Sequence, residues 1–229
     1  MRRLPRGGHD GKQGRDLDTG RQEVSATVTP LKFRAPLVQE DEARAGYYAL
    51  LARLFYSGPD AGLLQTISGS AEFAVAGGQL TGPWNALAAA ASATAAEAAR
   101  VEYDEVFVGT GKAEVTPYAS FYLAATGREK ILVQLKQDLA SLGLGRANSA
   151  REPEDHFAGL FEVMRHLISE GSDDAALQKQ RGFFSAYLER SFPGFCLAVS
   201  ASERAKFYKD VSHFASSFLV VETEALKVF

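Results

Sequence analysis

Two short segments of the chain carry residues whose types and spacing could do chemistry. Residues 109–112 read Gly-Thr-Gly-Lys, which invites comparison with phosphate-binding loops. A P-loop needs Gly-x-x-x-x-Gly-Lys followed by Ser or Thr, so that backbone amides and the lysine surround phosphate while the hydroxyl meets magnesium. Val106 stands at the first glycine position and Ala113 at the hydroxyl position, and Glu114 replaces the third glycine of a dinucleotide fingerprint. We interpret these glycines as the end of a helix and a sharp turn.

The second segment is Asp155-His156. A carboxylate beside an imidazole can set its tautomer and raise its basicity, as acid–base catalysis or a metal site would require. A catalytic pair also needs a nucleophile or a metal, and the sequence holds neither Gly-x-Ser-x-Gly nor His-Glu-x-x-His. The alternative is structural: Asp155 caps helix-start amides and His156 packs half-buried. The residues alone favour this alternative, and we expect no catalytic residue, metal or cofactor.

Composition restricts the function further. The chain has 229 residues, is 46% hydrophobic and carries a formal net charge of −3. It can bury one substantial core, and mixed charges argue against a nucleic-acid binder. The single cysteine, Cys196, excludes an intramolecular disulfide or a thiolate metal cluster and is expected to be buried. No run approaches the roughly 20 apolar residues that span a bilayer.

The first 39 residues differ from the rest. They begin with Arg2-Arg3 but contain no apolar block, and they hold several glycines and charges. They therefore do not fit a signal peptide, and we expect residues 1–39 to be a disordered leader and the protein to be cytoplasmic.

Residues 40–229 show helical periodicity and no sustained period-two alternation. In the first half, we expect a helix from Glu40 to Phe55, a short helix starting at Pro59-Asp60 and a loop over residues 68–82. One long alanine-rich helix is predicted from Trp84 to Phe107, because alanine has the highest helix propensity.

In the second half, a short helix follows Ser120, and another ends at Gly143. Pro153 suits the first turn of the next helix. That helix carries the clearest apolar stripe: Phe157, Leu160, Phe161, Met164, Leu167 and Ile168. Pro193-Gly194 is expected to break the chain before a last helix from about Ser202. We predict an all-α, single-domain bundle of about nine helices.

Three motifs carry a resemblance to a known family. Residues 103–109 read Tyr-Asp-Glu-Val-Phe-Val-Gly, residues 117–123 read Pro-Tyr-Ala-Ser-Phe-Tyr-Leu, and residues 152–156 read Glu-Pro-Glu-Asp-His. In this order, from about Tyr47 to about Glu224, the chain resembles the TorD/DmsD family of redox-enzyme maturation chaperones. It departs mildly from the family, with Val106 where leucine is usual.

The resemblance implies a TorD-like fold and a chaperone without catalytic activity. Such a protein binds the twin-arginine signal peptide and the apo-form of a molybdopterin oxidoreductase, assists cofactor insertion and delays export until maturation. By motif, a leader-binding groove would involve Gly109, Pro117, Tyr118, Ser120, Tyr122, Glu152, Pro153, Asp155 and His156.

The physical chemistry of an arginine pair and an apolar leader fits these segments. Carboxylates suit the arginines, and the candidates are Glu102, Asp104, Glu105, Glu152, Glu154 and Asp155. An aromatic groove suits the apolar stretch, with Phe107, Tyr118 and Tyr122 as candidates; plain core packing is the alternative for Phe107 and Phe121.

Two other functions stay open: an enzyme that handles GTP or the molybdenum cofactor, and a purely structural helical adaptor. The client also stays open between a formate dehydrogenase, a sulfoxide or N-oxide reductase and a nitrate-reductase-like enzyme, and so does a homodimer.

Overall fold

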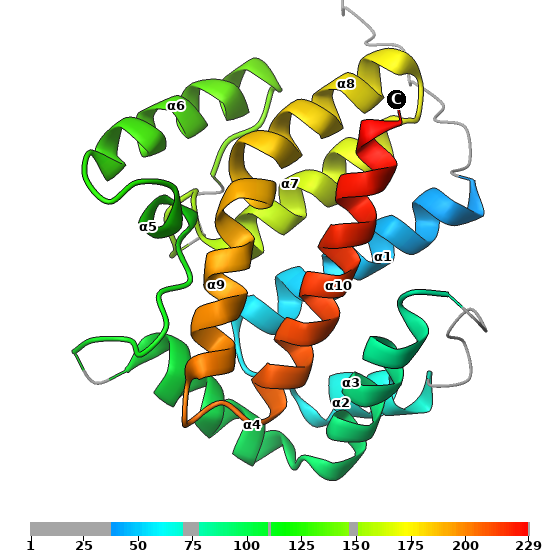
Figure 1. Ribbon diagram of the computed structural model, residues 1–229, viewed down its shortest axis with the longest axis vertical. Helices are drawn as coiled ribbons and strands as arrows, with labels where there is room; N and C mark the ends of the chain where they lie inside the picture. Colours follow the sequence, from blue (N-terminus) through cyan, green and yellow to red (C-terminus); the bar gives the residue numbers. More distant parts are fainter. Residues whose placement is uncertain (1–37, 71–77, 110, 147–150, 229) are drawn as a thin grey trace, which may run out of the picture. The chain divides into compact units, whose positions relative to one another are not determined.

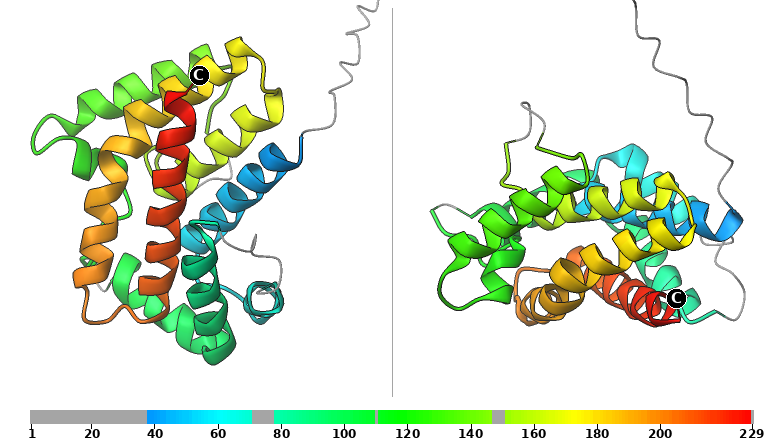
Figure 2. Two further views of the ribbon diagram at one scale, coloured as in Figure 1. Left: turned by 45° about the vertical axis from the view of Figure 1, so that its right-hand side comes forward. Right: turned by 90° about the horizontal axis from the view of Figure 1, so that it is seen from above.

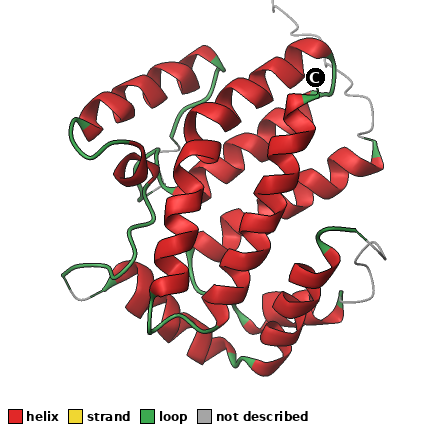
Figure 3. Ribbon diagram, in the orientation of Figure 1, coloured by secondary structure: helices red, strands yellow, loops and turns green. Residues whose placement is uncertain are grey.

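The computed structural model describes residues 38–70, 78–109, 111–146 and 151–228. Over these residues the chain is helical without a β-strand (Figure 3), and all of them belong to one compact unit. Two π-helical segments directly continue neighbouring α-helices, so the ten α-helices form nine continuous runs in the described part of the chain. This confirms the predicted all-α class and the number of helices. The predicted leader, residues 1–39, lies outside the described residues up to position 37, and the first helix begins at Gln39.

The elements follow one another in the order α1 Gln39–Tyr56, α2 Ala61–Gly69, α3 Thr81–Ala93, α4 Ala96–Tyr103, η2 Asp104–Val108, α5 Ala119–Leu123, α6 Arg128–Ser141, α7 Phe157–Glu170, α8 Asp174–Phe183, η3 Phe184–Leu188, α9 Glu189–Ala201 and α10 Phe207–Lys227. Helices α1 and α7 pack along each other, and α10 packs against α9 and α3 (Figures 1 and 2). No helix among the described residues has the length and apolar character needed to cross a membrane.

The core is a cluster of aromatic rings where α1, α7 and α9 meet. The Phe157 and Phe195 ring centroids lie 4.6 Å apart, those of Phe55 and Phe195 lie 5.2 Å apart, and those of Phe161 and Phe192 lie 5.4 Å apart. All five side chains are buried. Since truncating a buried phenylalanine to alanine typically costs about 3–5 kcal/mol, this cluster fixes α7 against its neighbours. The apolar stripe predicted for α7 is buried at all six positions, and Cys196 is buried as expected.

The long alanine-rich helix predicted from Trp84 to Phe107 is wrong. Helix α3 ends at Ala93, Thr94 and Ala95 are extended, and α4 begins at Ala96. The Thr94 hydroxyl donates to the Ala90 carbonyl at 2.7 Å, which gives the last turn of α3 a side-chain partner. Helix α3 packs on α2 and α10 whereas α4 continues into η2; this tertiary packing overrides the high helix propensity of alanine.

The break predicted at Pro193-Gly194 is also wrong, because both residues lie inside α9. The π turn of η3 immediately precedes α9, and the core positions Phe192 and Phe195 on either side are buried. Burial of these rings outweighs the hydrogen bond that a proline cannot donate. Gly194 lies against α5: a Cβ atom there would stand 3.0 Å from Cδ1 of Tyr122.

The last helix begins at Phe207 rather than near Ser202, because a distant carboxylate caps it. The Glu102 side chain accepts backbone hydrogen bonds from Lys206 at 2.7 Å, from Tyr208 at 2.8 Å and from Phe207 at 3.2 Å. A helix start leaves such amides without intrahelical partners, and Glu102 supplies them from α4.

Candidate functional site

The two motif segments meet in space. Tyr118 and His156 form an isolated antiparallel β-bridge, in which the Ala119 amide donates to the Asp155 carbonyl at 2.9 Å and the Phe157 amide donates to the Pro117 carbonyl at 3.0 Å. The Tyr118 and His156 rings contact each other edge to face, with centroids 5.4 Å apart. The bridge places the starts of α5 and α7 side by side.

Asp155 and His156 cap two different helices. The Asp155 carboxylate accepts a hydrogen bond from the Ser120 amide, at the start of α5, at 3.3 Å. His156 is the N-cap of α7, where its Nδ1 accepts from the Ala158 amide at 3.2 Å. Asp155 therefore caps α5 and not its own helix, and His156 is fully buried rather than half-buried. The structural alternative from the sequence is therefore right for Asp155, which caps a helix start, and wrong in the degree to which His156 is buried.

The hydrogen bond to Ala158 sets the state of the imidazole. An Nδ1 that accepts a hydrogen bond carries no proton, so the neutral ring holds its proton on Nε2. Burial lowers the pKa of His156, and the nearby Glu152 and Asp155 carboxylates oppose this shift without cancelling it. His156 is therefore neutral at pH 7.

Glu152 is held by Tyr118. The Tyr118 hydroxyl donates to Oε2 of Glu152 at 2.6 Å. Pro153 lies in a tight turn ahead of α7, where its carbonyl accepts from the His156 amide at 3.2 Å. The sequence predicted Pro153 in the first turn of α7, and this prediction is wrong. The segment first pairs with Tyr118, and α7 begins only at Phe157.

Gly109 and Tyr122 stabilise the segment between η2 and α5, which leads to Tyr118. Gly109 ends η2 with φ at 64°, and a Cβ atom there would lie 2.2 Å from the Lys112 carbonyl oxygen. The Tyr122 hydroxyl donates to the Thr116 carbonyl at 2.9 Å, and its ring lies 6.0 Å from that of Phe195. Phe107 is buried in the core, whereas Phe121 is 43% exposed beneath the Arg128 guanidinium; core packing of Phe121 was therefore wrong.

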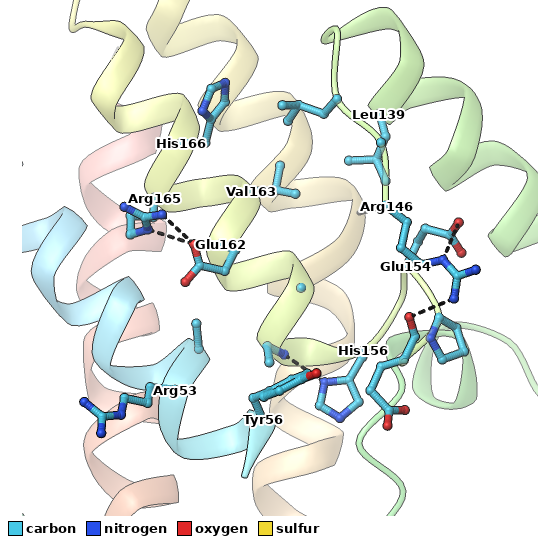
Figure 4. Close-up of a pocket in the computed structure, with 17 residues that line it drawn as sticks. Arg53, Tyr56, Leu139, Arg146, Glu154, His156, Glu162, Val163, Arg165 and His166 are labelled. Carbon is cyan, nitrogen blue, oxygen red and sulfur yellow. Dashed lines mark hydrogen bonds and ion pairs between the residues drawn. The ribbon is translucent and has the colours of Figure 1, made fainter. Parts of the chain in front are cut away.

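A groove of about 550 Å³ runs between α1, α7 and the segment after α6; we call it the His156 groove (Figure 4). Of the residues predicted from the sequence, Glu152, Pro153, Glu154 and His156 line it, whereas the other predicted site residues do not: Gly109, Pro117, Tyr118, Ser120, Tyr122 and Asp155. Tyr56 and His156 lie side by side at one end, with ring centroids 6.5 Å apart, and His166 lies towards the other end.

The sequence did not predict the apolar wall of the His156 groove. This wall comes from α1, the end of α6 and α7, and includes Ala52, Leu139, Leu144, Ala158, Gly159 and Val163. Gly159 was the available signal, because a glycine inside a strongly apolar helical stripe often has a packing or functional reason.

The charges around the groove are partly paired. Glu154 lies 3.7 Å from the Lys136 ammonium and 4.0 Å from the Arg146 guanidinium, and Glu162 pairs with Arg165 at 2.7 Å. The other predicted carboxylates either cap helices or do not line the groove. Glu102 caps α10 and Asp155 caps α5, and Asp104 and Glu105 do not line the groove.

The sequence matches the family model described as nitrate reductase delta subunit over residues 77–197, a range that contains both bridged motifs. The chain belongs to this family. The resemblance to TorD-type chaperones is thereby confirmed, and the relatives named next agree with it.

Relatives with the name Chaperone protein TorD include proteins from three bacteria. The protein from Shewanella loihica is 26% identical over 206 residues, which cover 81% of this chain and 94% of that protein. The one from Vibrio parahaemolyticus is 23% identical over 134 residues, 55% of this chain and 62% of its own length. The one from Photobacterium profundum is 26% identical over 112 residues, 45% and 52% of the two chains. The match thus spans less than two thirds of the last two relatives. No solved structure gives a significant match.

Proposed function

We propose that this protein is a maturation chaperone that binds the twin-arginine leader and the apo-form of a molybdopterin oxidoreductase in the cytoplasm. It assists cofactor insertion there and delays export until the client is mature, without catalysing a reaction itself. One observation carries the proposal: the two family motifs join at the Tyr118–His156 bridge, and His156 lines the groove. Membership in the family and the chaperone name of the relatives support it.

Two carboxylates in the groove lining suit an arginine pair. Glu152 and Glu154 line the groove together with Arg146, and Glu154 lies near two cations at 3.7 and 4.0 Å. These distances are too long for good charge-assisted hydrogen bonds, whereas an incoming guanidinium can bind a carboxylate with two parallel hydrogen bonds. The Lys136 and Arg146 side chains are 60% and 46% exposed, and ion pairs of exposed groups are weak, so a ligand arginine can compete with them for Glu154.

The apolar wall suits the stretch that follows the arginines in a leader. Leu144 and Val163 offer partly exposed apolar surface, and Gly159 has no side chain to fill the groove. A short apolar helix can place its side chains against such a wall. In this proposal Glu152 and Pro153 contact the leader, and His156, which lines the groove but is only 3% exposed, offers an edge of its ring. Four residues position these contacts: Pro117, Tyr118, Ser120 and Asp155. Gly109 and Tyr122 stabilise the segment that leads to Tyr118.

Calorimetry with a client leader peptide tests the proposal. The peptide should bind with one-to-one stoichiometry, and its Lys-Lys variant should bind at least about tenfold more weakly, because lysine cannot form the bidentate contact. Glu154→Gln should reduce the affinity for the Arg-Arg peptide. Glu129→Gln removes the same charge from the exposed start of α6, away from the groove, and should not. Equal binding of both peptides, or of neither, would sink the proposal.

The client class is a separate question. A formate dehydrogenase, a sulfoxide or N-oxide reductase and a nitrate-reductase-like enzyme are the candidate clients. The oxidoreductase that co-purifies with the full chain would identify it.

A further inference from the structure

A second groove, of about 840 Å³, lies between the first half of α1, the start of α3 and the end of α10; we call it the Trp84 groove. Glu40, Ala43, Arg44 and Tyr47 line it, and their spacing places them on one face of α1. Ala52, Arg53 and Tyr56, which line the His156 groove, lie about half a turn around the same helix. The two grooves therefore use opposite faces of α1.

The floor of the Trp84 groove is aromatic. The Tyr47 ring centroid lies 5.8 Å from that of Trp84 and 5.4 Å from that of Phe218, and all three residues line the groove. Apolar side chains continue along α10 through Val221 and Ala225 to Val228, which is 82% exposed. This surface offers a partner an apolar strip that begins deep in the fold and reaches solvent.

Arg44, the one cation among the described residues that line the groove, is already neutralised. Arg44 donates to both Glu222 oxygens, at 2.7 and 3.0 Å, and to Asp41 at 2.8 Å. The Glu222 carboxylate also accepts from the Tyr48 hydroxyl at 3.1 Å. Because Glu222 and Asp41 together exceed the charge of Arg44, this buried cluster is anionic overall.

The rim of the groove is acidic as well. Glu40 comes from α1 and Glu224 from α10, and both line the groove and are exposed. Glu224 pairs with Lys227 at 2.9 Å, but both side chains are more than half exposed, so the pair is weak and exchangeable. The carboxyl end of α10, the negative end of its helix dipole, lines the same groove. Rim and helix end therefore both favour cations.

We propose that the Trp84 groove binds an amphipathic helix of a partner protein. Its apolar face packs on Tyr47, Val221 and Ala225, above the buried rings of Trp84 and Phe218, and its lysines or arginines pair with Glu40 and Glu224. The helix-in-groove mode needs an apolar floor and complementary rim charges, and this groove supplies both. The proposal does not depend on leader binding in the His156 groove. It gives the chain a second protein-binding surface on the other face of α1.

The single tryptophan of the chain reports on this groove directly. Trp84 is the only tryptophan in the sequence, so its fluorescence can be followed in the full chain without a label. The probe is a leucine–lysine peptide of about 18 residues, or five helical turns, compared with a leucine–glutamate peptide of the same pattern. The lysine peptide should shift the Trp84 emission saturably, and the glutamate peptide should bind at least about tenfold more weakly.

A matched pair of variants separates groove binding from general attraction to an acidic protein. The double variant Glu40→Lys and Glu224→Lys should weaken binding of the lysine peptide about tenfold or more, as expected for two lost ion pairs that become repulsive. Glu129→Lys with Glu203→Lys makes the same change in net charge at exposed positions outside the groove, and should keep most of the affinity. Circular dichroism of both variants checks that they fold.

Three outcomes would overturn the proposal. The two peptides could bind equally, or the two double variants could lose affinity equally. Alternatively, light scattering of the chain alone could show dimers that Ala225→Phe, which fills the groove, abolishes; a second copy of the chain would then be the occupant.

Discussion

The Tyr118 hydroxyl donates a hydrogen bond of 2.6 Å to Oε2 of Glu152, 34 positions further along the chain. Burial, and secondly the Glu152 carboxylate, raise the pKa of the Tyr118 phenol, so it remains protonated and remains the donor at neutral pH. Glu152 thus reaches the His156 groove with one oxygen fixed by the neighbouring motif. The bond couples the groove rim to the β-bridge.

The variant Tyr118→Phe removes this hydrogen bond and keeps the ring against His156. Because the Tyr118 side chain is only partly buried, the free energy of unfolding should fall by about 1 kcal/mol. Urea denaturation measures this loss. If the free energy of unfolding changes by less than a few tenths of a kcal/mol, the bond does not fix Glu152.

Glu102→Gln tests the cap that α4 supplies to α10. The carboxylate accepts three backbone amides and is 8% exposed, so removing its charge should lower the free energy of unfolding by about 2 kcal/mol. The exposed Glu105, in the next turn, is the matched control. Glu105→Gln should stay within about 0.5 kcal/mol of the parent, and similar losses in both variants would contradict the role of Glu102.

The N-cap at His156 makes stability depend on pH. Folding lowers the pKa of His156 below its ordinary value of 6.5, mainly through burial, so the unfolded chain binds the proton more readily. The contribution to stability is therefore complete above pH 6.5 and is lost as pH falls below that value towards the folded pKa. Protonation would also turn the Nδ1 acceptor into a donor and remove the cap.

The variant His156→Asn isolates this titration, because asparagine is a good N-cap residue that does not titrate. Denaturation series at pH 7.5 and pH 5.5 should show a larger loss of stability for the parent than for the variant. An identical loss in the two proteins would assign the pH dependence to other groups.

Gly109→Ala should be much more damaging than Gly111→Ala. Both glycines have positive φ, at 64° and 98°, but only at Gly109 would a Cβ atom collide, 2.2 Å from the Lys112 carbonyl oxygen. Gly111 has nothing within 4 Å of that position, so its substitution carries the conformational cost alone, about 1 kcal/mol. Melting temperatures of the two variants should differ by several degrees, and equal values would rule out the close contact.

Gly159→Leu fills the apolar wall of the His156 groove. The leader peptide should then bind at least about tenfold more weakly, as a lost apolar contact surface implies. Gly46→Leu, at an exposed helical position of α1 that lines neither groove, gains similar helix propensity. Both variants should be as stable as the parent or more so, and only Gly159→Leu should lose affinity.

Much of the fold could be predicted from periodicity, and its failures are instructive. The α7 stripe is readable because six large apolar residues recur on one helical face. The break at Thr94 could not be predicted, because a run of alanines has no apolar stripe that marks one face of a helix. Only the packing of α3 against α2 and α10 determines where α3 ends. Pro193 misleads because its local penalty is smaller than the gain from burying Phe192 and Phe195.

The sequence could predict that the two motifs of the candidate site lie together, but not which residues form the apolar wall of the groove. Tyr118 and His156 lie together, as the pairing of the two motifs required. Glu102, however, looked like one more acidic candidate, and nothing local to it reveals amides more than 100 positions away. Likewise Ala52 and Val163 are ordinary helical residues until α1 and α7 are placed side by side.

The buried Asp155 carboxylate has a consequence for how mutational surveys of this protein are interpreted. The carboxylate caps the amino end of α5 from a segment 35 residues away. Substituting Asp155 therefore weakens the contact between the two motifs even when no ligand is bound. A survey that measures only peptide binding would then count Asp155 among the contact residues, although its carboxylate stabilises the start of α5. Scoring thermal denaturation of the same variants beside capture separates the two roles.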